Sequence, residues 1–129
     1  MEYNFERTVY SDIVVETVLL RRATSYEAET YKNILLQDIN SGVRKLVVDL
    51  TCCDFLDSTF TGATIVSLRK IVAIGGDLRL VGLQPAVKNM FELTRVIRQF
   101  DLFQTVEAAV KSYADQDSLG LRNNRLLLH

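Results

Sequence analysis

Histidine is almost absent from this chain of 129 residues, because the one histidine, His129, is the last residue. A hydroxyl or thiol nucleophile is commonly activated by an imidazole, so the composition argues against a Ser-His-Asp or Cys-His site. The G-x-x-x-x-G-K-[ST], G-x-G-x-x-G and H-E-x-x-H motifs are also missing. Asp54 and Asp57 are paired carboxylates, but no second polar cluster completes an acid–base site. We therefore expect a protein that is not an enzyme, with no catalytic residue, no metal ligand and no cofactor.

Cysteine is scarce as well, and the two cysteines, Cys52 and Cys53, are adjacent. This spacing forms neither a disulfide framework nor a C-x-x-C metal or redox motif. No apolar run approaches the roughly 18–20 residues of a membrane span, and the start MEYNFERTVY lacks a signal-peptide core. The net charge is −1, from 15 basic and 16 acidic side chains, which does not favour direct binding of nucleic acid. These absences predict a reduced, cytoplasmic protein without a membrane span.

What the chain does contain is an alternation of strand-like and helix-like segments. Residues 3–10 and 12–20 are rich in β-branched and aromatic side chains and predict a β-hairpin. LVVDL at 46–50 is a continuous apolar run, typical of a strand covered on both faces, and DLRLVGL at 77–83 predicts another strand. Strands that alternate with helices predict an α/β domain in which right-handed crossovers join parallel strands.

Start and stop signals place the first two helices. Thr24-Ser25-Tyr26-Glu27 fits the capping box, in which the hydroxyl and the carboxylate satisfy free backbone amides reciprocally. Asn40-Ser41-Gly42 supplies the stop. A second helical segment runs from about Thr59 to Ala73 and is closed by Gly75-Gly76.

Two further helices follow the last predicted strand. Pro85 suits a first helical position and opens PAVKNMFELTRVI. After a brief connection at 101–103, Thr105 caps a final helix, VEAAVKSY. From Ala114 the composition turns polar and then becomes apolar at LLL. We therefore assign the domain to residues 1–113 and expect the tail, 114–129, to be disordered or docked.

The second helix carries two neighbouring stripes of largely apolar residues. The first stripe has the spacing of a face that packs on a sheet and consists of Thr61, Ile65, Leu68 and Val72. The second stripe consists of Phe60, Ala63, Ser67 and Ile71. Because a helix that covers one face of a sheet needs only one stripe, the second is either part of a wide buried face or a strip that binds a partner.

The residues at 54–62, DFLDSTFTG, join the strand at 46–50 to this helix. Ser58 stands at the expected N-cap, where a hydroxyl accepts hydrogen bonds from backbone amides one turn ahead. The same position keeps the hydroxyl at the surface, within reach of a modifying enzyme. From the residues alone, Ser58 is therefore either an ordinary cap or a site of modification.

Three segments, in this order and spacing, resemble the STAS domain of bacterial anti-sigma factor antagonists: VVDLTCCDFLDSTFTG, GGDLRLVGLQPAVKNMFELT and FDLFQTVEAAV. The resemblance covers roughly residues 9–113 and implies the STAS fold, a mixed central sheet with helices. In that family a switch kinase, itself the anti-sigma factor, phosphorylates the serine after the aspartate. The unphosphorylated antagonist binds the kinase, which releases its sigma factor, and a phosphatase restores the antagonist.

The resemblance implies a regulatory binding protein whose partners are an anti-sigma factor kinase and a phosphatase, with a homodimer left open. The phosphorylated serine corresponds to Ser58. The partner-binding residues that we expect are Asp57, Ser58, Thr59, Phe60, Ala63 and Ser67.

The chain departs from the family pattern at two places. Phe60 replaces the glycine that usually follows D-S-[ST], and a basic turn at 20–24 replaces a turn that often carries glycine and an acidic residue beside the serine loop. Two alternatives stay open. One is a STAS subunit of a larger assembly, transporter-associated or a signalling scaffold, in which Ser58 is only a cap; the other is a small enzyme or ligand-binding protein that uses the same loop.

Overall fold

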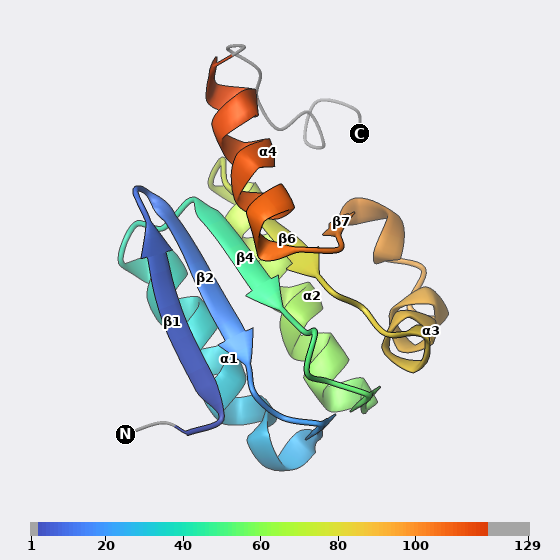
Figure 1. Cartoon of the computed structure of the whole chain (residues 1–129). Coiled ribbons are helices and arrows are strands. Elements are labelled where there is room, and N and C mark those ends of the chain that lie inside the picture. The colour runs from blue at the N-terminus through green and yellow to red at the C-terminus, as the bar shows by residue number, and fades with distance from the viewer. Residues whose placement is uncertain (1–2, 119–129) are drawn as a thin grey trace.

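The computed structural model describes residues 3–118 and has the α/β architecture with a mixed sheet that the sequence predicts (Figure 1). In chain order its elements are β1 (Phe5–Tyr10), β2 (Ile13–Val18), β3 (Arg22–Ala23), α1 (Ser25–Asn40), β4 (Lys45–Asp49), β5 (Phe55–Leu56), α2 (Ser58–Ala73), β6 (Asp77–Val81), α3 (Pro85–Leu93), the 3-10 helix η1 (Ile97–Gln99), β7 (Asp101–Phe103) and α4 (Val106–Ser118). No helix within this part of the chain is long and apolar enough to cross a membrane.

The main sheet has five strands in the order β1-β2-β4-β6-β7, and β3 pairs with β5 in a separate two-stranded sheet. β1 and β2 form the predicted antiparallel hairpin, with Phe5 opposite Val18. The other neighbours in the main sheet run parallel. A connection between two parallel strands runs from the carboxyl end of the first strand back to the amino end of the next. α1 and α2 are such connections, so both begin at the carboxyl ends of the strands.

Helices cover both faces of the main sheet, which explains why its central strands are apolar on both sides. α1 and α2 lie side by side behind the sheet, and α4 crosses its front (Figure 1). Leu46 and Val48 of β4 contribute to the core on the side of α1 and α2, whereas Val47 packs with Ala109 and Tyr113 of α4.

The predicted helix starts are confirmed where local chemistry decides them. Both hydrogen bonds of the capping box between Thr24 and Glu27 are present at α1, and Pro85 is the first residue of α3. At α4 the backbone amide of Ala108 donates to the Thr105 hydroxyl over 3.1 Å.

The C-terminal part differs from the prediction in three places. Residues 101–103 form the strand β7 and not only a connection. So short a strand is defined by its pairing with β6 and not by a side-chain pattern. α3 ends at Leu93 instead of continuing to Ile97, since Arg95 takes a φ of 60° that breaks the helix. α4 continues past Tyr113 to Ser118, so the start of the predicted tail is helical, while residues 119–129 lie outside the described residues.

Candidate functional site

The loop that carries Ser58 is anchored by the small sheet. β3 and β5 pair Arg22 with Phe55 and Ala23 with Leu56, and the backbone amide of Asp57 donates to the Ala23 carbonyl over 3.0 Å. These bonds fix the starts of α1 and α2 next to each other at the carboxyl edge of the parallel strands. Binding sites of open α/β sheets commonly lie at this edge.

Asp57, not Ser58, is the N-cap of α2. One oxygen of the Asp57 carboxylate accepts a hydrogen bond from the Phe60 amide over 2.9 Å, and the other accepts one from the Ser25 amide of α1 over 2.6 Å. A single carboxylate therefore accepts one backbone amide from the first turn of each of two helices and lies at the positive ends of both helix dipoles. The expected cap role of Ser58 is wrong, because aspartate and serine are equally good caps and the approach of α1 selects the aspartate.

Ser58 and Thr59 are the first two residues of α2, and both are exposed. Asp57 beside them is half-buried. The structure thus brings together three of the predicted partner-binding residues, Asp57, Ser58 and Thr59, at one accessible helix start.

The other three predicted partner-binding residues lie inside the protein. Phe60 is 0% exposed, Ala63 6% and Ser67 0%. The Phe60 ring stacks on Tyr31 of α1, with 4.0 Å between the ring centroids and 9° between the planes. The expectation of a partner-binding strip is therefore wrong for this stripe. α2 packs on α1 as well as on the sheet, and for that reason it carries two apolar stripes.

The basic turn lies against the serine loop. Nη2 of Arg21 is 3.0 Å from Oδ2 of Asp54, and the guanidinium of Arg22 sits 4.2 Å from the centroid of the Phe55 ring. Both arginines are exposed, so the Arg21–Asp54 pair contributes little to stability. The result is a surface near Ser58 that carries both cationic and anionic side chains.

Tyr26 is a surface feature of this region that sequence reasoning missed. It follows Ser25 in the first turn of α1, and 93% of its surface is exposed. The signal was present in the sequence, because Tyr26 lies off the buried stripe that contains Ala28 and Tyr31. Exposed tyrosines with one apolar and one polar end are enriched at interfaces.

Asp57→Ala should lower the free energy of unfolding by about 2 kcal/mol, because it removes charge-assisted hydrogen bonds from two helix starts. Ser58→Ala should change the same quantity by at most about 0.5 kcal/mol, as is usual for exposed positions. Urea unfolding of both variants measures the difference, with Asp54→Ala as the matched acidic control from the same loop. A larger loss for Ser58→Ala than for Asp57→Ala would contradict the assignment of the cap.

Comparison with known proteins identifies the family. A model of the STAS domain matches residues 7–109, so the chain belongs to the STAS domain family. It is 26% identical over 89 residues to a Bordetella bronchiseptica protein named as an anti-sigma factor antagonist, BtrV, and the match covers 69% of this chain and 77% of that protein.

Solved structures have the same fold. A Thermotoga maritima protein described as an anti-sigma factor antagonist has a TM-score of 0.74 at 21% identity, over 85% of this chain and 94% of that one. The phosphorylated form of SpoIIAA, a Bacillus cell fate determinant, has a TM-score of 0.70 at 19% identity, over 84% of this chain and 98% of that one. The predicted family and fold are thereby confirmed.

Proposed function

We propose that this chain is an anti-sigma factor antagonist that binds an anti-sigma factor kinase and loses that partner when Ser58 is phosphorylated. The observation that carries the proposal is an exposed serine at the first position of α2, directly after the aspartate that caps the helix. The naming of BtrV and the existence of a phosphorylated form of SpoIIAA, a protein of the same fold, support it. In this proposal the chain is a cytoplasmic binding protein, not an enzyme, and a phosphatase restores its binding.

The helix start can hold a phosphate without refolding. A phosphoryl group adds about −1.5 to −2 charges and three acceptor oxygens, and the positive end of the helix dipole favours an anion. The Asp57 carboxylate already accepts from the amides of Phe60 and Ser25. A phosphate on Ser58 would therefore project toward the surface and would change the charge that a partner meets.

Phe60, the residue that replaces the usual glycine, does not obstruct this chemistry. Its ring points into the core and stacks on Tyr31, so the exposed neighbour that follows Ser58 is Thr59. Burial of the ring also argues against a permanent interface on the second stripe, as a subunit of a larger assembly would have there.

The partner-binding surface in this proposal consists of Asp57, Ser58 and Thr59 at the start of α2, with Tyr26 on α1 and Arg22 on β3. The exposed guanidinium of Arg22 makes part of this surface cationic. We therefore expect the partner to place an acidic group opposite Arg22 and to lose binding when a second negative charge appears near Asp57.

Substitution of Ser58 separates a switch from a merely structural serine. Ser58→Asp should weaken binding to the anti-sigma factor kinase at least about tenfold. The effect should be larger at low salt, because added salt screens the repulsion. Ser58→Ala should keep binding but accept no phosphate. Calorimetry with a kinase that binds the wild-type chain measures affinity, and mass spectrometry after incubation with ATP locates the phosphate.

Thr59→Asp is the matched control, because it adds the same charge one residue further along the helix. It should weaken binding less than Ser58→Asp if the partner contacts Ser58 directly. Phosphate found only on Thr59 or Thr61, or equal affinity for the wild type and both Ser58 variants, would overturn the proposal.

A further inference from the structure

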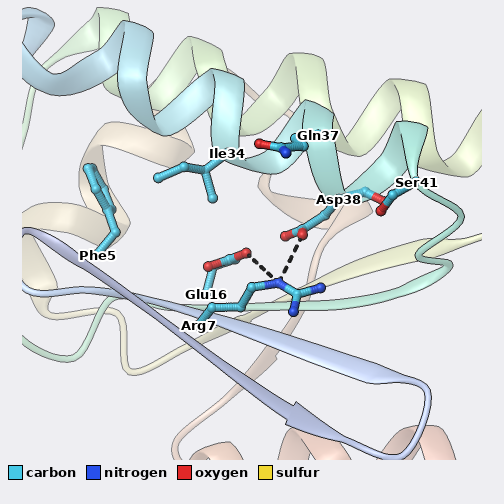
Figure 2. A pocket seen from close by; sticks show the side chains of 7 residues that line it. All are labelled: Phe5, Arg7, Glu16, Ile34, Gln37, Asp38 and Ser41. Carbon is cyan, nitrogen blue, oxygen red and sulfur yellow. Dashed lines mark hydrogen bonds and ion pairs between the residues drawn. The ribbon is translucent and has the colours of Figure 1, made fainter. Parts of the chain in front are cut away.

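A pocket of about 390 Å³ lies between the β-hairpin and the C-terminal half of α1. It is formed at the end of α1 that is far from Ser25 and the Ser58 loop. Phe5 and Ile34 form an apolar wall, and Arg7, Glu16 and Asp38 supply its charged groups (Figure 2). Its volume is within the range of pockets that bind small molecules.

The two carboxyl groups of this pocket are buried. Glu16 is 2% exposed and Asp38 is 5% exposed. Glu16 Oε2 and Asp38 Oδ2 accept no hydrogen bond from the described part of the chain. Nearly all buried polar groups in proteins have a hydrogen-bond partner, so two such oxygens in one pocket need an explanation.

Arg7 lies beside both carboxyl groups but donates no hydrogen bond to either of these two oxygens. Its Nε is 3.2 Å from Asp38 Oδ1 and 3.7 Å from Glu16 Oε2, and both carboxyl groups point toward it in Figure 2. One guanidinium faces two carboxyl groups, so the cluster carries one excess negative charge whenever both are ionised. An uncompensated buried charge is costly.

The surroundings of Glu16 favour its protonated, uncharged form. Burial and the adjacent Asp38 carboxyl raise the pKa of Glu16 to about 9, against a smaller opposing effect of Arg7. The other neighbours add no cation: burial also raises the pKa of Tyr31 on α1, which keeps its hydroxyl neutral, and Val48 lies opposite Glu16 on β4.

We propose that this pocket is a binding site for a small organic cation, an amine or amidine with a short apolar part, whose charge offsets the excess negative charge of Glu16 and Asp38 beside Arg7. The cation donates hydrogen bonds to the two oxygens that have no partner, and its apolar part packs on Phe5 and Ile34. A metal ion fits less well, because the described residues contain no group of three or more metal-ligating side chains. An anion fits less well because Arg7 already faces two carboxyl groups.

Benzamidine is a suitable probe, because it combines a planar cation having several donors with an aromatic ring. Calorimetric titration of the full chain at pH 7.5 should show binding of benzamidine and none of benzamide, its neutral analogue, or of benzoate. Glu16→Gln and Asp38→Asn should each weaken binding at least about tenfold, as loss of a charged hydrogen bond does. Glu29→Gln is the matched control, an exposed acid on the same helix, and should leave the affinity unchanged.

The wild-type chain alone supplies a second measurement, which is needed if a variant fails to fold. Because binding requires loss of a proton from Glu16, the affinity should rise about tenfold per pH unit between pH 6.5 and 8.5. Titration in two buffers of different ionisation enthalpy should show release of close to one proton per ligand. A pH-independent affinity, equal binding to the wild type and both pocket variants, or no binding at millimolar benzamidine would each overturn the proposal.

Discussion

Phe60→Ala should lower the free energy of unfolding by about 3–5 kcal/mol, the usual cost of deleting a buried aromatic ring. Phe60 is fully buried between α1 and α2 and stacks on Tyr31 with 4.0 Å between the ring centroids. Tyr31 also stacks on Phe5 of β1 over 6.0 Å. Deleting the Phe60 ring leaves a cavity between the two helices and removes one of the two aromatic partners of Tyr31. Urea unfolding, followed by far-UV circular dichroism, measures the change.

Val66→Ala provides the control, because Val66 lies on the same helix and is 39% exposed. This variant should change the free energy of unfolding by less than about 1 kcal/mol. Phe60→Ala should reduce partner binding only in proportion to the fraction of chain that unfolds. If Phe60→Ala kept wild-type stability but failed to bind the kinase, Phe60 would instead belong to the recognition surface.

Periodicity and local chemistry predicted the secondary structure well, but they left the role of the second stripe open. The sequence shows that Phe60, Ala63 and Ser67 share a face of α2, yet it does not show what covers that face. The answer depends on α1, which lies outside the segment and meets α2 only in the folded protein. An apolar stripe therefore indicates that the face is buried, but only the tertiary structure shows which element covers it.

The cap of α2 illustrates the same limit at the candidate site. Asp57 and Ser58 are adjacent and equally suited to capping, so local propensity does not choose between them. The amide of Ser25, brought close by the pairing of β3 with β5, selects Asp57. This selection leaves Ser58 without a capping role, and the proposed site of phosphorylation depends on that freedom.

The buried pair of acids was the largest feature that sequence reasoning missed. Glu16 lies between Val14 and Val18 on one face of β2, and Asp38 follows Tyr31 and Leu35 at helical spacing on α1. Each pattern places an acidic residue on an apolar face, which is the signal that was available. Only the packing of α1 on the hairpin shows that the two acids share one pocket.

Glu16→Gln should make the protein more stable than the wild type at pH 8 but about equally stable at pH 4. In the unfolded chain Glu16 ionises near its ordinary pKa of 4.5, whereas in the folded protein its pKa is raised to about 9 by burial and by Asp38. The folded state therefore binds more protons between these values. The contribution of Glu16 to stability is fully present below about pH 4.5 and declines as the pH rises toward 9, by at most about 1.4 kcal/mol per pH unit.

Glutamine has the shape of the protonated acid and does not titrate, so the variant should lose this decline. The difference between variant and wild type cancels the titration of all other groups that the substitution leaves unchanged. It should reach several kcal/mol at pH 8, with an upper limit of about 5 kcal/mol. Urea unfolding of both proteins at pH 4, 6 and 8 measures it. Glu29→Gln, which replaces an exposed acid, should show no such trend. A difference that stays constant with pH, or that favours the wild type more as the pH rises, would mean that Glu16 is ionised in the folded protein and that Arg7 alone balances the pair.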